Sequence, residues 1–132
     1  MKEPYLTSAE RRALIDSYLR KNVRIEIDRP VGYVHHKEKY DLIYPINYGY
    51  IPNVLGGDAE ELDVYLLGVR EPVEEYDVRI IGAVIRTDDV EDKLVGAPDG
   101  MTFTKSEIED AVRFQEQYHT SYVETAKKQN LE

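Results

Sequence analysis

The first part of the chain shows two successive patterns of hydrophobic residues, one with helical spacing and one with strand spacing. Near the start, apolar residues three or four positions apart predict a helix over residues 7–21, and the spacing of Thr7 and Glu10 is typical of a capping box at its first turn. From residue 23 to residue 28, apolar and charged residues alternate strictly, which predicts a half-buried strand. Pro30 ends this segment.

Further apolar runs predict additional strands. A short strand is expected over residues 40–44, and buried strands over 62–69 and 78–86 are joined by a connection rich in Glu and Pro. A last short strand is expected over 94–97, before a Pro-Asp-Gly turn.

The last part of the chain is predicted to be one long helix. Thr104 and Glu107 repeat the capping-box spacing. One face would then carry Ile108, Ala111, Val112, Gln115, Tyr118, His119, Tyr122 and Ala126. Short strands followed by a packed helix predict an α+β fold, with a small antiparallel barrel and flanking N- and C-terminal helices, in a single domain over residues 1–132.

The composition of the chain argues against several classes of protein function. The net charge of −9 argues against a nucleic-acid-binding protein, which would present a basic face. The chain has no Cys, and its first residues, Met-Lys-Glu-Pro, carry no apolar signal core. No apolar run is long enough to span a bilayer, so we expect a cytoplasmic protein without a membrane partner.

The densest chemical signal is the stretch Asp-Ala-Glu-Glu-Leu-Asp at residues 58–63. It holds four carboxylates in six residues, which repel one another unless a cation lies among them. Oxygen ligands of this kind bind hard divalent cations such as Mg²⁺. Taken alone, the stretch is more typical of a solvated acidic turn.

Two neighbouring segments favour the metal hypothesis. Tyr-Pro-Ile-Asn-Tyr-Gly-Tyr-Ile occupies residues 44–51, and Asp-Asp-Val-Glu-Asp-Lys-Leu-Val occupies residues 88–95. In this order and spacing, the three segments resemble those of the soluble family I inorganic pyrophosphatases. The resemblance implies an OB-like five-stranded barrel, a homo-oligomer, and Mg²⁺-dependent hydrolysis of pyrophosphate or a related phosphoanhydride, with Mn²⁺ as a possible substitute.

The resemblance also assigns the residues of an acidic half of the site. Asp58 and Asp63 would hold the activating metals, with Asp63 shared between two of them. Asp88 and Asp92 would hold the metal that arrives with the substrate, and Glu26 would add an early carboxylate. Glu60 would orient or deprotonate the attacking water, and Tyr48 would lie beside this nucleophile.

A basic half would hold the phosphates. Lys93 resembles the phosphate-binding Lys of the family, and Tyr118 resembles a phenolic donor on the last helix. Arg29 and Lys37 are the favoured early cations, and His119 stands where the family has Lys. A second departure is Glu60, which is one methylene longer than the family's Asp.

Two alternatives stay open. The chain could hydrolyse a different phosphoanhydride, or it could be a divergent barrel that binds metal or phosphate without catalysis. An enzyme with a covalent nucleophile is disfavoured because there is no Cys and no Ser in a nucleophile-elbow context.

Overall fold

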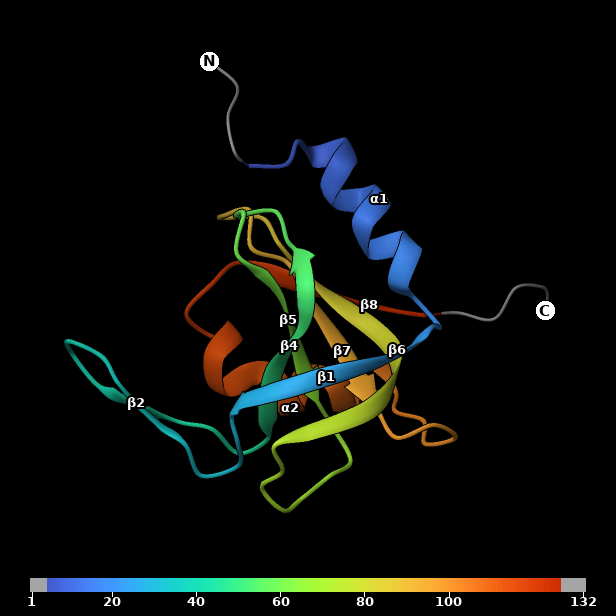
Figure 1. The fold of residues 1–132 in the computed structure, drawn as a ribbon. Helices are drawn as coiled ribbons and strands as arrows, with labels where there is room; N and C mark the ends of the chain where they lie inside the picture. Colours follow the sequence, from blue (N-terminus) through green and yellow to red (C-terminus); the bar gives the residue numbers. More distant parts are fainter. Residues whose placement is uncertain (1–4, 127–132) are drawn as a thin grey trace.

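The computed structural model describes residues 5–126, which form a strand barrel flanked by two helices (Figure 1). In chain order the elements are α1 (Ser8–Tyr18), β1 (Asn22–Arg29), β2 (Val34–His36), β3 (Asp41–Ile43), β4 (Asn47–Leu55), β5 (Glu61–Leu66), β6 (Glu75–Arg86), β7 (Lys93–Ala97), α2 (Lys105–Glu116) and β8 (Ser121–Thr125). Both predicted capping boxes are present, at Thr7 and at Thr104.

Five strands close the barrel in the order β1-β4-β5-β7-β6, because β1 also pairs with β6. β8 extends the sheet from β6, and β2 with β3 forms a separate hairpin that projects from the barrel (Figure 1). The predicted five-stranded OB-like barrel is confirmed. Its pairing is mixed, however, because β5 and β7 run parallel while the other pairs of the barrel are antiparallel.

The prediction of one long C-terminal helix is wrong. α2 ends at Glu116, and β8 follows after a short turn and pairs with β6. Therefore Tyr118, His119 and Tyr122 do not lie on a helical face. The segment Ser121–Thr125 alternates an exposed Tyr122 with a buried Val123, and its β-branched and aromatic residues favour a strand. The apolar residues of this segment also agree in part with helical spacing, which is why the alternation was not recognised.

Residues 44–51 contribute most of β4, which the hydrophobic pattern did not single out. Gly49 lies where β4 crosses β1, and a Cβ atom there would overlap the carbonyl oxygen of Glu26. Glycine is therefore required for the close approach of the two strands. This packing places the two flanking residues, Tyr48 and Tyr50, on the other face of the strand.

Two hydrophobic clusters fill the molecule. One is aliphatic, is centred on residues such as Ile25, Leu62 and Ile80, and includes Ile15 of α1. The other contains three tyrosines of β4, β5 and the segment before β4, and it packs against Ile108 and Val112 of α2. These tyrosines are Tyr44, Tyr48 and Tyr65. A buried tyrosine needs a partner for its hydroxyl group, so this second cluster requires polar groups at its edge.

Candidate active site

A cleft of about 350 Å³ lies at the edge of the tyrosine-containing cluster. It brings together residues from β1, the β2–β3 hairpin, the barrel strands and the end of α2. Its lining is made of Asp28, Arg29, His35, Lys37, Tyr48, Asp63, Arg86, Glu91, Lys93, Gln115, Tyr118 and His119. The predicted residues Arg29, Lys37, Tyr48, Asp63, Lys93, Tyr118 and His119 are therefore neighbours in one cleft.

Asp63 is the central carboxylate of this cleft. Its Oδ2 accepts hydrogen bonds from the Tyr48 hydroxyl at 2.8 Å and from Lys93 Nζ at 3.0 Å. Burial, followed by the charge of Asp63, raises the pKa of Tyr48 well above its ordinary value. Tyr48 therefore stays protonated near neutral pH and acts as a hydrogen-bond donor, not as a base.

Glu91, and not Asp92, is the carboxylate of the last acidic segment that faces the cleft. Lys93 Nζ donates to Glu91 Oε2 at 2.7 Å, so Glu91 and Asp63 converge on the same ammonium group. The carboxylate of Asp92 instead forms two hydrogen bonds with Arg11 of α1, at 2.6 and 2.8 Å. Glu91 and Asp92 precede β7 and point to opposite sides, Glu91 toward Lys93 and Asp92 toward Arg11.

Arg86 lies on the floor of the cleft, with only 2% of its side chain exposed. Its Nε and NH2 atoms donate to the carboxylate of Glu116 at 3.2 and 2.8 Å, and the Tyr65 hydroxyl donates to Glu116 at 2.6 Å. Burial acts to lower the pKa of Arg86, but the hydrogen bonds and charge of Glu116 outweigh it and the net shift is upward. Arg86 is therefore a permanent cation.

Arg29 forms another cationic corner of the cleft. Its NH1 donates to the Tyr44 hydroxyl at 2.6 Å and lies 3.3 Å from His35 Nδ1. Burial and the charge of Arg29 lower the pKa of His35. His35 is therefore neutral near pH 7 and can accept a hydrogen bond from the guanidinium.

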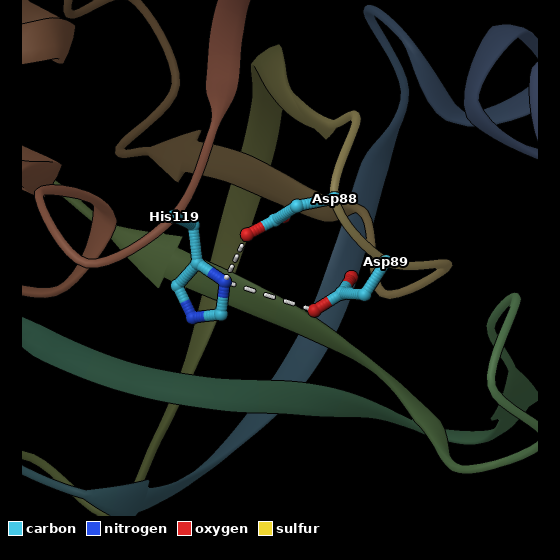
Figure 2. A group of neighbouring side chains, drawn as sticks. All are labelled: Asp88, Asp89 and His119. Atoms are coloured by element: carbon cyan, nitrogen blue, oxygen red, sulfur yellow. Dashed lines mark hydrogen bonds and ion pairs between the residues drawn. The ribbon is translucent and has the colours of Figure 1, made fainter.

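The end of α2 and the following turn supply the rim. Tyr118 stacks on Tyr40 of the segment before β3, with ring centroids 4.6 Å apart. Figure 2 shows His119 beside the carboxylates of Asp88 and Asp89, with Nδ1 at 3.2 and 3.7 Å from their nearest oxygens. One ligand atom from each of these three residues lies within 4.8 Å of the others, a spacing that a metal ion could bridge. Asp88 thus adjoins the cleft through His119 without lining it.

The remaining predicted carboxylates lie outside the cleft lining. Glu26 accepts a hydrogen bond from the Tyr50 hydroxyl at 2.9 Å on an exposed part of the sheet. Asp58 accepts from the backbone N–H of Glu60, whose side chain is exposed at the turn between β4 and β5. Ala59 lies between them with a φ of 67°, which costs a non-glycine residue about 1 kcal/mol. This strained turn fixes the directions of Asp58 and Glu60.

Comparisons with known proteins identify the family of this chain. The family model described as inorganic pyrophosphatase matches residues 13–130. The chain belongs to the inorganic pyrophosphatase family. A relative named inorganic pyrophosphatase from Campylobacter jejuni is 31% identical over 93 residues, which cover 65% of this chain and 54% of the relative. Another relative of that name, from Mesorhizobium japonicum, is 29% identical over 58% of this chain and 46% of its own length. The chain thus spans about half the length of these curated relatives.

Solved structures show the same fold. An inorganic pyrophosphatase from Ehrlichia chaffeensis has a TM-score of 0.63 at 19% identity, covering 82% of this chain and 88% of that protein. One from Helicobacter pylori has a TM-score of 0.57 at 18% identity, covering 82% of this chain and 84% of that protein. Within residues 5–126, no helix is long and apolar enough to cross a membrane.

Three charged residues of this family member escaped the sequence analysis, although each left a signal. Glu91 is two positions before Lys93, and residues at that spacing lie on one side wherever the chain is extended. Glu116 follows Ile108 and Val112 at helical spacing on the buried face of α2. Arg86 ends the apolar run of β6 and is buried. A charge on a buried face requires a partner, and Glu116 and Arg86 are each other's partners.

The donor set of the cleft fits a divalent metal. The oxygens of Asp63 and Glu91 lie 3.0 and 2.7 Å from the same Lys93 nitrogen, so the two carboxylates are close enough to be ligands of one cation. Both side chains are partly open to solvent, at 23% and 35% exposure. The cleft therefore has the hard oxygen ligands that Mg²⁺ prefers and room for its water ligands.

Proposed function

We propose that this chain hydrolyses inorganic pyrophosphate, or a related phosphoanhydride, to phosphate with a divalent metal, Mg²⁺ or Mn²⁺. The observation that carries the proposal is the meeting of two carboxylates, Asp63 and Glu91, with four cations in one cleft. The four cations are Arg29, Lys37, Arg86 and Lys93. A highly charged anion that is cleaved by a metal-activated water needs both kinds of group. Membership of the family supports the same chemistry.

In the proposed mechanism, Asp63 and Glu91 hold the metal, which when bound supplies charge neutralisation and lowers the pKa of a water. Arg29, Lys37 and Lys93 bind phosphate oxygens and hold the diphosphate so that water can attack one phosphorus. The bond from that phosphorus to the bridging oxygen then breaks, which gives two phosphates. Tyr48 keeps the Asp63 carboxylate in position through its hydrogen bond.

The turn with Asp58 and Glu60 is proposed as the outer part of the metal-binding wall. It packs against the loop before β7, since a Cβ atom at Gly57 would overlap the carbonyl oxygen of Val90. Glu60 is proposed to orient the attacking water, and His119 with Asp88 is proposed to complete the opposite rim. These roles, together with a cytoplasmic location and a homo-oligomeric state, stay predictions.

A phosphate-release assay tests the function. The purified protein would be given pyrophosphate and a small panel of nucleoside diphosphates, triphosphates and phosphate esters, with Mg²⁺, with Mn²⁺ and with EDTA. We expect phosphate release from pyrophosphate that EDTA abolishes and Mg²⁺ restores. Release only from another phosphoanhydride would identify a different substrate, and no release from any compound would favour a non-catalytic binding protein.

A further inference from the structure

Arg86 has no role in the function proposed above beyond its charge, although it is the most deeply buried cation of the cleft apart from Lys93. Its guanidinium group is fixed on one edge. Nε and NH2 face the two carboxylate oxygens of Glu116, and Glu116 is itself fixed by the Tyr65 hydroxyl. Such a two-point arrangement sets the plane of the guanidinium group.

The backbone of Arg86 is fixed as well. Its N–H donates to Asp92 Oδ1 at 3.0 Å, and its carbonyl oxygen accepts from Arg11 NH2 at 2.9 Å. The closed Arg11–Asp92 ion pair beside α1 therefore supports Arg86 from behind. Side chain and backbone together hold the guanidinium at one place and in one orientation.

The third nitrogen of the guanidinium, NH1, is aimed at the acidic side of the cleft. It lies 3.5 Å from Asp89 Oδ2 and 3.4 Å from Glu91 Oε1. Both distances exceed the value of about 2.7–2.9 Å that is usual for a charge-assisted hydrogen bond. NH1 thus makes only two long hydrogen bonds, and a shorter bond to an oxygen in the cleft could replace either of them.

The charge balance of the cleft points to an anionic ligand. Its lining holds Arg29, Lys37, Arg86 and Lys93 against Asp28, Asp63 and Glu91. The cations exceed the carboxylates here, in a chain whose net charge is −9. At the floor, Arg86 and Lys93 are already paired with Glu116, Asp63 and Glu91. Among the residues that the structure describes, Arg29 and Lys37 form no ion pair, so the unmatched positive charge of the lining lies on their side of the cleft, where an anion can supply the counter-charge.

We propose that Arg86 is a substrate-binding residue whose NH1 binds a phosphoryl oxygen of a diphosphate, so that the cleft binds such an anion without any divalent metal. Glu116 and Tyr65 are positioning residues that act through Arg86. The identity of the ligand rests on the proposed function, but binding in the absence of metal does not depend on hydrolysis.

The test is calorimetric titration of the full chain with methylenediphosphonate, a diphosphate analogue that cannot be hydrolysed, in buffer with EDTA. We expect the wild-type chain to bind it. The double variant Arg86→Met with Glu116→Gln removes the cation and its buried counter-charge together, and it should weaken binding by about 10- to 100-fold. Arg24→Met with Glu75→Gln is the matched control, because it removes an exposed ion pair outside the cleft and, like the test variant, leaves the net charge unchanged.

A second measurement does not require a neutral variant to fold. The Nε–H signal of Arg86, assigned by its absence in Arg86→Lys, should shift when the analogue is added in EDTA. Arg86→Lys keeps the charge but loses the planar group, and it should bind several-fold more weakly than wild type.

The inference is overturned if the wild-type chain shows no binding in EDTA, or if the folded double variant binds as tightly as wild type. An Nε–H signal that does not move also contradicts it. These outcomes are distinguishable from failure of the proposed function. Binding in EDTA without hydrolysis in Mg²⁺ would contradict the proposed hydrolase function but support the binding role of Arg86. Hydrolysis in Mg²⁺ with unchanged binding by the double variant would support the hydrolase function but contradict the role of Arg86.

Discussion

Two charged regions lie on opposite sides of the same short segment, and they differ in how their charges are matched. Beside α1, Asp92 meets Arg11 in a two-point ion pair whose side chains are 6% and 15% exposed. In the cleft, Asp63 and Glu91 share one ammonium group, and Arg86 NH1 approaches at longer distances. The first region is closed, because both carboxylate oxygens are already bonded, and the second keeps ligand-binding capacity.

The difference shows how a charged cluster that stabilises a fold can be separated from one that binds a ligand. Burial alone does not separate them, since Lys93 and Asp92 are both buried. What separates them is the ratio of charges and the exposure of the carboxylates. Asp92 is 6% exposed and has one guanidinium to itself, whereas Asp63 and Glu91 are 23% and 35% exposed and share one ammonium group in a cleft that also holds Arg29 and Lys37, so the cleft can accept an anion or a metal.

The largest expected effect is a loss of activity when a carboxylate of the cleft is neutralised. Asp63→Asn should lower phosphate release from pyrophosphate by at least about 100-fold, or about 2.7 kcal/mol of barrier, because a neutral amide is a poor metal ligand. The fold should persist, since the amide oxygen can still accept from Tyr48 and Lys93. Steady-state phosphate release at saturating Mg²⁺ measures this, with the exposed Asp99→Asn as the matched control. Near wild-type release by Asp63→Asn would refute the role of Asp63.

Breaking the Arg11–Asp92 ion pair should lower the stability of the fold. Asp92→Asn leaves Arg11, whose side chain is only 15% exposed, without its counter-charge and should lower the free energy of unfolding by about 3 kcal/mol. Urea unfolding followed by circular dichroism is the measurement. A loss below about 1 kcal/mol would mean that the pair contributes little to stability. It would contradict the view that this region stabilises the fold while the cleft binds a ligand.

A pH titration separates the buried Glu116 from the other carboxylates. Burial acts to raise its pKa, but hydrogen bonds from Arg86 and Tyr65 outweigh it, so the pKa in the folded chain lies below the ordinary 4.5. A lowered pKa contributes stability above about pH 4.5 that is lost as the pH falls through the folded value. Thermal unfolding between pH 3 and 7 should therefore show a shallower acid limb in Glu116→Gln than in wild type. Parallel acid limbs would contradict this.

The smallest effect is expected at the surface. Arg12 of α1 pairs with Glu124 and Asp16, but its side chain is 40% exposed. Arg12→Ala should cost only about 0.2–1 kcal/mol, because solvent screens the pair. Urea unfolding of this variant and of Asp92→Asn compares the ion pair of Arg12 with that of its neighbour Arg11. An equal loss in both variants would show that burial does not set the strength of these pairs.

Much of the fold was predictable because it is local. Both capping boxes, the alternation of β1 and the buried runs of β5 and β6 appear in the structure near the predicted residues. The parallel pairing of β5 with β7 and the strand β8 were not predictable in this way. Strand partners are chosen by packing between distant segments, and five residues such as Ser121–Thr125 agree with a helical and an extended period about equally.

The sequence by itself determined that this chain forms a small barrel with two capped helices and that its acidic and basic groups suit phosphate chemistry. In the structure, Glu91 and Asp92 point to opposite sides, Glu91 toward Lys93 and Asp92 toward Arg11. Only the tertiary structure decided which face is the cleft. α1 covers one side and closes Asp92 with Arg11, while α2 brings Glu116 beneath Arg86 and leaves Glu91 in the open cleft. Alternation fixes two directions, but what lies in each direction depends on which distant element packs there.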